Sequence, residues 1–185
     1  RMFEFVKGSV TFDTVDNPLI AFEGARQFGK FTRLLSLFDI NLLHITLPDF
    51  HNLTLRYDQF EIALKKGNKD RIGECNSTIK FIKEQKEIVD TYNQIKLNKN
   101  FKKRVTHHDT KISNVLFDKN GKGLCVIDLD TVMPGYFISD VGDMIRTYLS
   151  PVSEEEKDFS KIHIRDEYFR AIVDGYLTEM KNELS

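Results

Sequence analysis

Apolar residues recur at three- and four-residue steps along much of the chain, and this spacing predicts most of its regular structure. The clearest stretch begins at Pro18, which suits a first helical turn because it has no amide hydrogen to leave unpaired, and Asp16 or Asn17 can cap it. We predict a helix over residues 18–38, with one apolar face made by Phe22, Ala25, Phe28, Phe31, Leu35 and Phe38.

The same periodicity predicts further helices over residues 59–66, 139–149 and about 165–180. Gly67 would end the first of them, and residues 47–60 look irregular. A long helix is predicted from about Asp70 to Leu97, with an apolar face of Ile72, Cys75, Ile79, Ile82, Val89, Tyr92 and Ile95. The segment "SEEEKDFS" at residues 153–160 is expected to be an exposed acidic connection.

Three short stretches alternate or run apolar in a way that predicts strands. One covers residues 2–6 and ends at Gly8, and the other two are "NVLFD" and "LCVIDLD". Asn120-Gly121 lies between the last two and is a strong hairpin signal. The predicted fold class is therefore α+β and mainly helical, with helices packed around a small hairpin.

Composition indicates an ordinary core-forming soluble protein. The chain has 185 residues, of which 41% are apolar and 30% charged, with a net charge of −1. The near-neutral charge argues against nucleic acid as a partner, and no stretch has the length of a membrane span. Cys75 and Cys125 form no CxxC pattern, so we interpret both as small core residues in a reducing compartment, which predicts a cytoplasmic location.

The polar run "THHDTKISN" at residues 106–114 stands directly before the predicted hairpin. Because the hairpin folds the chain back, Asn114 and Asp128 should reach the same edge, with Asp109 on the adjoining loop. Carboxylate and amide oxygens converging there suit a hard divalent cation such as Mg²⁺. A carboxylate just outside such a metal can accept a proton from a hydroxyl nucleophile.

Each of these residues also has a plain structural interpretation. Asp and Asn at strand ends often form turns or caps, and His107 would fit a hydrogen-bonded core position. For any single residue that interpretation is the better one. The joint pattern His-x-Asp-x-Lys-x-x-Asn fixes four residue types at set spacings, and a chance match is roughly below one in a thousand.

"HHDTKISN" resembles the catalytic loop of the protein-kinase-like fold, H-R-D-x-x-x-x-N, and "VIDLD" stands where its metal-binding Asp-Phe-Gly segment would come. The longer run "HHDTKISNVLFD…CVIDLDTVMPG…DVGDMIRT" is similar to the aminoglycoside phosphotransferase and choline kinase superfamily. Within it, the chain most resembles N-acetylhexosamine 1-kinases, which phosphorylate the anomeric hydroxyl of a sugar. "FEFVKGSVTFD", "RQFGKFTRLLSLF" and "LPDFHNLTLRY" extend the resemblance over most of the chain.

The resemblance implies a role for each residue of the loop. Asp109 would be the catalytic base, and Asn114 and Asp128 would bind Mg²⁺ on the phosphates of ATP. His107 would brace the loop backbone. Lys111 would steady the transferring phosphoryl group as a point charge.

Residues outside the loop receive weaker assignments. Asp143 in "DVGD" would be a structural anchor for the catalytic loop. Leu129-Asp130 replaces the Phe-Gly of protein kinases, which leaves Asp130 free to meet sugar hydroxyls. His51 and Arg56 are further candidates for sugar contacts, with core or surface roles as the open alternatives.

The same resemblance implies a division of the chain. Residues 1–10 would be the last strand and hinge of a nucleotide-binding lobe, with the backbone of Glu4, Phe5 and Val6 facing adenine. Residues 11–185 would be the helical C-terminal lobe, with the catalytic loop at 106–131. No Gly-rich loop or Val-Ala-Ile-Lys strand is present, so we expect an ATP-dependent sugar kinase whose N-terminal lobe is missing here and which is inactive without it.

Two other functions compete with a kinase. In a metal-dependent phosphohydrolase, His107, His108 and Asp109 would bind metal directly, although no remaining histidine forms an HxxxH pair. A non-catalytic, pseudokinase-like binding module is the second alternative. A degenerate site need not keep Asp109, Asn114 and Asp128 together, which argues against it.

Overall fold

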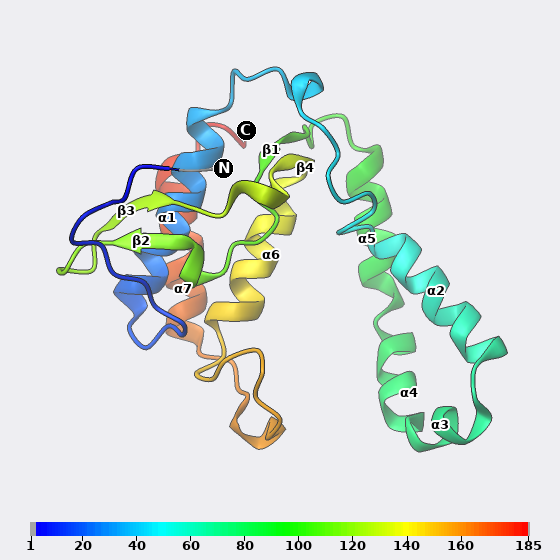
Figure 1. Ribbon diagram of the computed structural model, residues 1–185. Helices are drawn as coiled ribbons and strands as arrows, with labels where there is room; N and C mark the ends of the chain where they lie inside the picture. The colour runs from blue at the N-terminus through cyan, green and yellow to red at the C-terminus, as the bar shows by residue number, and fades with distance from the viewer. Residues whose placement is uncertain (1–2, 185) are drawn as a thin grey trace. The chain divides into compact units, whose positions relative to one another are not determined.

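A computed structural model of the chain describes residues 3–184 and divides into two compact units (Figure 1). The first unit comprises residues 3–46 and 103–184, and the second comprises residues 47–102. Within the described range, every helix is too short or too polar to cross a bilayer. Each unit is described by itself.

The first unit combines three helices with two small antiparallel sheets. The helices are α1 (Pro18–Leu34), α6 (Phe137–Tyr148) and α7 (Asp166–Met180). One sheet pairs β1 (Arg104–Thr106) with β4 (Met133–Gly135), and the other pairs β2 (Val115–Phe117) with β3 (Gly123–Val126). One-turn 3₁₀ helices lie at Ile40–Leu42, Ile112–Asn114, Leu129–Thr131 and Phe159–Lys161.

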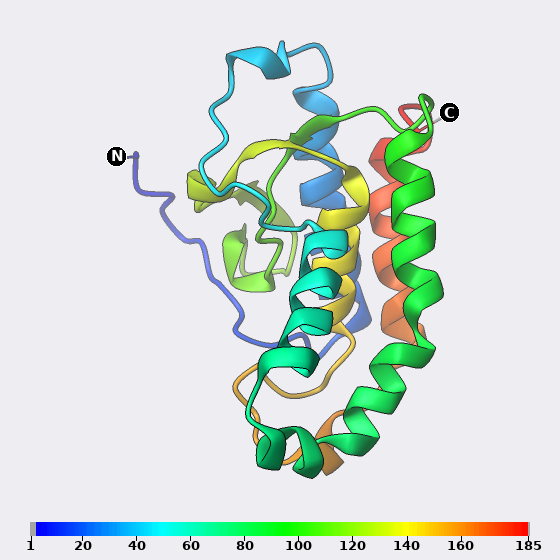
Figure 2. The ribbon, with the colours of Figure 1, turned by 90° about the vertical axis from the view of Figure 1, so that its right-hand side faces the viewer.

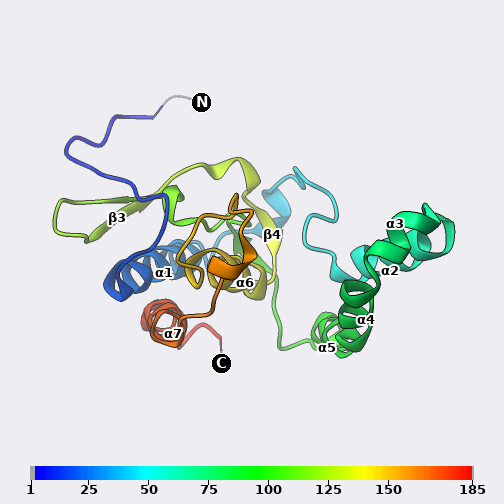
Figure 3. The ribbon, with the colours of Figure 1, turned by 90° about the horizontal axis from the view of Figure 1, so that it is seen from below.

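These elements form successive layers around one apolar core. Seen from below, the β2–β3 hairpin lies against α1, and α1 lies against α7 (Figure 3). Phe28 of α1, Phe117 of β2 and Tyr148 of α6 are fully buried where the layers meet. The apolar face predicted for α1 is therefore the face that packs, although the helix ends at Leu34 and Phe38 is 41% exposed.

The hairpin forms where the sequence predicts it. The Asp118 carboxylate accepts hydrogen bonds from the amides of Asn120 and Lys122 at 2.8 and 3.0 Å, and Gly121 has φ 79°. A residue without a Cβ tolerates this backbone conformation, so Gly121 suits the turn. In the register, Val115 pairs with Val126.

The strand predicted over residues 2–6 is wrong for its described part, and residue 2 lies outside the described residues. Residues 3–6 have no regular structure, and the pairing occurs instead at Val10, whose amide and carbonyl bond to Phe117 at 2.8 and 2.9 Å. Alternating apolar residues make a strand only where a neighbour supplies ladder hydrogen bonds. Phe3 and Phe5 are 74% and 80% exposed.

The second unit contains four helices, with α2 (Leu53–Lys66) running against α5 (Lys86–Leu97) (Figure 2). Between them lie α3 (Lys69–Glu74) and α4 (Asn76–Glu84). Helix α2 ends at Gly67 as predicted but begins earlier, because the Asn52 side chain caps it by accepting from the Leu55 amide.

The single helix predicted over residues 70–97 is interrupted twice. The backbone leaves helical geometry at Cys75 and again at Gln85. Val89 is buried, but Cys75 is exposed, so its predicted core position is wrong. The break at Cys75 takes this side chain off the apolar face of the helices that flank it.

The close packing of α1 on α7 can be tested by substituting a glycine where the two helices meet. A Cβ added at Gly175 would collide with the backbone carbonyl of Phe22, which cannot swing aside as a side chain can. We expect Gly175→Ala to lower the free energy of unfolding by about 1–3 kcal/mol, measured by urea denaturation. Gly142→Ala on α6 is the matched control, since nothing lies within 4 Å of its added Cβ. The control should be neutral or stabilising by up to about 1 kcal/mol, and equal effects of the two substitutions would contradict the close approach.

Candidate active site

The polar loop that follows β1 is fixed by a carboxylate on α6. The two oxygens of the fully buried Asp140 side chain accept hydrogen bonds from the backbone amides of His107 and His108, at 2.9 and 2.8 Å. One turn further along, Asp143 accepts from the Thr110 amide at 2.7 Å. The anchoring position predicted for Asp143 is thus next to the loop. Asp140 was missed, although its spacing of three from Asp143 puts both on one helix face.

Burial and hydrogen bonding act on Asp140 in opposite directions. Removal from water raises the pKa of this carboxyl to about 7, and the nearby charge of Asp143 acts in the same sense. The two amide donors from His107 and His108 lower the pKa, because they favour the charged form. The side chain therefore titrates near neutrality while serving as the acceptor for two adjacent amides.

Asp140→Asn tests this double acceptor. Asparagine offers one oxygen and one NH₂ group, so one of the two loop amides would lose its acceptor inside the protein. We expect the variant to lower the free energy of unfolding by about 1–3 kcal/mol in urea titrations. Asp174→Asn, at an exposed position of α7, is the control and should leave the stability unchanged.

The stabilities of the wild type and of Asp140→Asn should also depend differently on pH. The folded-state pKa of Asp140 lies above the ordinary value of 3.8, so its contribution is full at low pH and declines as the pH rises through about 7. The difference in unfolding free energy between wild type and Asp140→Asn should therefore be larger at about pH 5 than at about pH 8. A difference that is the same at both pH values would show that the carboxyl is charged throughout this range.

His107 connects the loop to the end of the hairpin. Its Nδ1 accepts from the Asp109 amide at 3.3 Å, which places the ring proton on Nε2, and Nε2 donates to the Ile127 carbonyl at 3.0 Å. The rings of Phe28 and Phe31 pack edge-on at 5.1 and 5.9 Å between centroids. Burial lowers the pKa of His107, so the imidazole is neutral at physiological pH. His107 thus lies between the loop and the hairpin, where a residue that braces the loop backbone would be expected.

Asp109 and Asn114 are in direct contact. The Asn114 side-chain amide donates both of its hydrogens to Asp109, one to the backbone carbonyl at 2.9 Å and one to Oδ2 at 3.1 Å. Oδ1 of Asp109 faces the Lys111 ammonium at the longer distance of 3.8 Å. One carboxylate oxygen is thus already hydrogen-bonded, the other has a looser contact, and the Asp109 side chain is 28% exposed.

Asp128 lies next to this pair through the hairpin. The Ile127 amide donates to the Asn114 carbonyl at 2.9 Å, and Asp128 follows in a left-handed conformation with φ 58°. The charges of Asp109 and Asp128 both act to raise the pKa of His107, against the larger lowering by burial. Hydrogen bonds therefore bring His107, Asp109 and Asn114 together with Ile127, the residue directly before Asp128.

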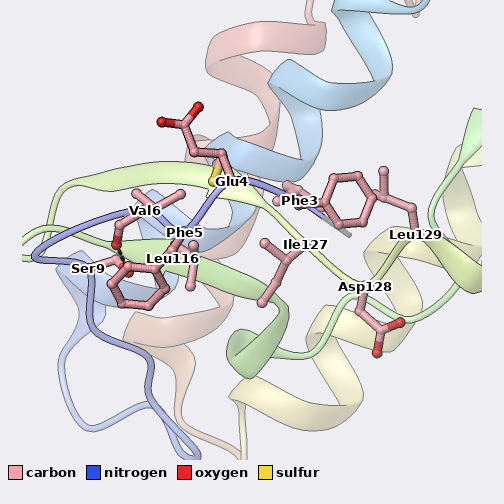
Figure 4. A pocket seen from close by; sticks show the side chains of 11 residues that line it. Phe3, Glu4, Phe5, Val6, Ser9, Leu116, Ile127, Asp128 and Leu129 are labelled. Carbon is pink, nitrogen blue, oxygen red and sulfur yellow. Dashed lines mark hydrogen bonds between the residues drawn. The ribbon is translucent and has the colours of Figure 1, made fainter. Parts of the chain in front are cut away.

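A pocket of about 420 Å³ adjoins Asp128 (Figure 4). The N-terminal segment supplies Phe3 to Val6 on one side, and Leu116 with residues 125–129 supplies the other. The Ser9 hydroxyl donates to the Val6 carbonyl at 2.8 Å and holds the segment in its turn. The Asp128 carboxylate lies at one end of the pocket, apart from the ring of Phe5 (Figure 4). Glu4, Phe5 and Val6, predicted to face a nucleotide base, all line this pocket.

The family model described as "Phosphotransferase enzyme family" (APH) matches residues 1–178. The chain belongs to this phosphotransferase family. The family is part of the protein-kinase-like superfamily, so the kinase-like resemblance of the polar loop is confirmed at that level. Its kinases generally use ATP and Mg²⁺.

The side chains of the phosphotransferase fit Mg²⁺. Both amide hydrogens of Asn114 are engaged on Asp109, so Oδ1 of Asn114 is the atom left to bind a cation. Together with the Asp128 carboxylate it would offer two oxygen ligands, and Mg²⁺ usually takes one or two carboxylates plus water and phosphate oxygens. Among residues 3–184, no three His, Cys, Asp or Glu side chains gather as a metal-binding cluster.

The three residues predicted to contact a sugar belong to different units of the chain. Asp130 is exposed in the turn after Asp128, and its carbonyl accepts from Thr46 at 3.4 Å. His51 and Arg56 belong to the second unit, where the His51 ring packs on Phe50 at 4.5 Å and Arg56 donates to Gln59 at 3.0 Å. Their role at the phosphotransferase site stays a prediction.

Two residues near Lys111 were missed by sequence reasoning. The Lys111 ammonium pairs with Glu154 at 2.8 Å, and the other Glu154 oxygen pairs with Arg146 at 2.6 Å. Arg146 also pairs with Asp143 at 2.8 Å. Glu154 lies in the segment predicted to be only an exposed acidic connection, and its three consecutive glutamates give no sign of which one contacts the loop.

Proposed function

We propose that this phosphotransferase transfers the γ-phosphoryl group of ATP to a hydroxyl of a sugar, with an N-acetylhexosamine as the acceptor and its anomeric hydroxyl as the nucleophile. Family membership supports the phosphotransfer, and the resemblance of "HHDTKISN" and its surroundings supports the sugar. The observation that carries the proposal is the pattern of contacts made by the two carboxylate oxygens of Asp109. Asn114 donates to one oxygen of its carboxylate, and the other has only the loose 3.8 Å contact with Lys111 on a side chain that is 28% exposed.

In the proposed reaction, Asp109 is the base. The sugar oxygen forms a bond to the γ-phosphorus as the bond from that phosphorus to the ADP oxygen breaks, and the hydroxyl proton passes to Asp109 Oδ1. The Asn114 contact at 3.1 Å fixes the rotation of the carboxylate, so the accepting oxygen is presented in one orientation. Phosphoryl transfer depends chiefly on such positioning and on charge stabilisation.

The surrounding groups divide between binding and electrostatics. Asn114 and Asp128 would hold Mg²⁺, which when bound neutralises charge on the nucleotide phosphates. Lys111 would face the transferring phosphoryl group as a second positive charge, and the pKa of its ammonium is raised mainly by the Glu154 hydrogen bond, so it stays protonated. His107 is neutral and fixes the loop without adding charge.

The apolar pocket would take the adenine of ATP. Its walls are mostly apolar, and it ends at Asp128, so a base bound between Phe5 and Ile127 would direct its phosphates toward the proposed metal ligands. Backbone groups of residues 4–6 would face the base. This arrangement supports the hinge role proposed for the described part of this segment.

Asp109→Asn in the intact protein tests the proposed base. Asparagine keeps the shape of the side chain but does not accept the hydroxyl proton, so turnover should fall by at least about a hundredfold. The measurement is coupled ADP release with ATP, Mg²⁺ and N-acetylglucosamine or N-acetylgalactosamine, with choline as the competing acceptor. Asp174→Asn is the control for loss of one aspartate charge and should turn over normally.

Near-normal turnover of Asp109→Asn would remove Asp109 from this role, and preference for choline would refute the sugar. Phosphate-ester cleavage without ADP formation would indicate the phosphohydrolase instead. The same assay on the 185-residue chain by itself tests the expectation that this lobe has little activity alone.

A further inference from the structure

The Lys111 ammonium lies between two carboxylates at unequal distances. It forms a close pair with Glu154 Oε1 at 2.8 Å and a loose one with Asp109 Oδ1 at 3.8 Å. The side chains of Lys111 and Glu154 are 38% and 36% exposed, so the Lys111 ammonium is not enclosed and has room to move. No step of the proposed reaction uses Glu154, yet it is the nearest partner of a residue that does take part.

The two oxygens of the Asp109 carboxylate have different neighbours. Oδ2 accepts from Asn114, so Oδ1 is the oxygen to which a substrate hydroxyl would donate. The same Oδ1 faces Lys111. An ammonium that moved in to a normal charge-assisted distance of about 2.8 Å would compete with the hydroxyl for that oxygen and make it less basic.

Glu154 is itself fixed relative to the loop by a chain of charged contacts. Its second oxygen binds Arg146, Arg146 binds Asp143, and Asp143 accepts the backbone amide of Thr110. Glu154 is thereby connected back to the loop that carries Asp109 and Lys111. Both of its carboxylate oxygens are paired with cations, which holds the pKa of Glu154 below its usual range.

We propose that Glu154 is a positioning residue that holds Lys111 away from Asp109 and so keeps the accepting oxygen of the base accessible. This inference rests on the proposed function, since it concerns access of a hydroxyl to Asp109. A partly exposed ion pair contributes little stability by itself. The ion pair instead determines which carboxylate the Lys111 ammonium binds. Without Glu154, the nearest alternative carboxylate is that of Asp109.

Glu154→Gln and Glu155→Gln form the matched pair for the test. Each removes one negative charge from the same segment, but the Glu155 side chain is exposed and forms no ion pair with Lys111. In the intact protein we expect Glu154→Gln to lower kcat/KM for the sugar by about tenfold, and Glu155→Gln to leave it unchanged. The deficit of Glu154→Gln should shrink as salt is raised, because the pair that forms between Lys111 and Asp109 is screened.

A double-mutant cycle separates positioning from a merely structural role. If Glu154 acts through Lys111, then Glu154→Gln should add nothing to the loss already caused by Lys111→Met. Additive losses would overturn the proposal, as would a Glu154→Gln enzyme with wild-type kcat/KM or one whose deficit is independent of salt.

A structural measurement keeps this inference distinct from the proposed function. In a crystal structure of Glu154→Gln, Lys111 Nζ should lie within about 3 Å of Asp109 Oδ1. A lysine that stays away from Asp109 in the variant would overturn the proposal whatever the reaction is. If the intact protein transfers no phosphoryl group to any acceptor, the proposed function fails, and this distance alone decides whether Glu154 controls the position of Lys111.

Discussion

The geometry of the site depends on one interaction, the binding of two consecutive loop amides by the buried carboxylate of Asp140. The chain leaves β1 at Thr106 and turns sharply, with His108 at φ 69°, so the amides of His107 and His108 need acceptors outside the ladder. Asp140 supplies both from a packed helix. The direction in which Asp109 leaves the loop follows from this backbone path.

Buried and exposed groups contribute differently to the site. Asp140 and His107 lie inside, where their hydrogen bonds are shielded from water and have few alternatives. Asp109, Lys111 and Glu154 lie at the rim, partly exposed, where an ammonium can exchange one carboxylate for another at little cost. The buried groups thus hold the loop, while the partly exposed charges at the rim can change their ion-pair partners. Such charges would suit a site that meets a charged substrate.

The β2–β3 hairpin serves two neighbouring features at once. Its open end brings Asn114 beside Ile127 and Asp128, where the candidate metal ligands lie. Its outer side, with Leu116 and Cys125, forms a wall of the apolar pocket. This short hairpin therefore places an apolar surface next to carboxylate and amide oxygens.

Features whose causes lie close together along the chain could be predicted from the sequence. The cap and first turn of α1 at Asn17-Pro18 and the turn at Asn120-Gly121 are local, and so is the polar spacing from His107 to Asn114, which with the longer runs around it carries the phosphotransferase resemblance. The partners of residues that are distant in sequence became known from the tertiary structure. It placed Asp140 under the loop amides and Glu154 on Lys111, left residues 3–6 without a strand partner, and broke the helix predicted over residues 70–97 at Cys75 and Gln85. Periodicity records which residues are apolar, but whether an amide, a carboxylate or an apolar face finds a partner is settled only when segments far apart in sequence pack together.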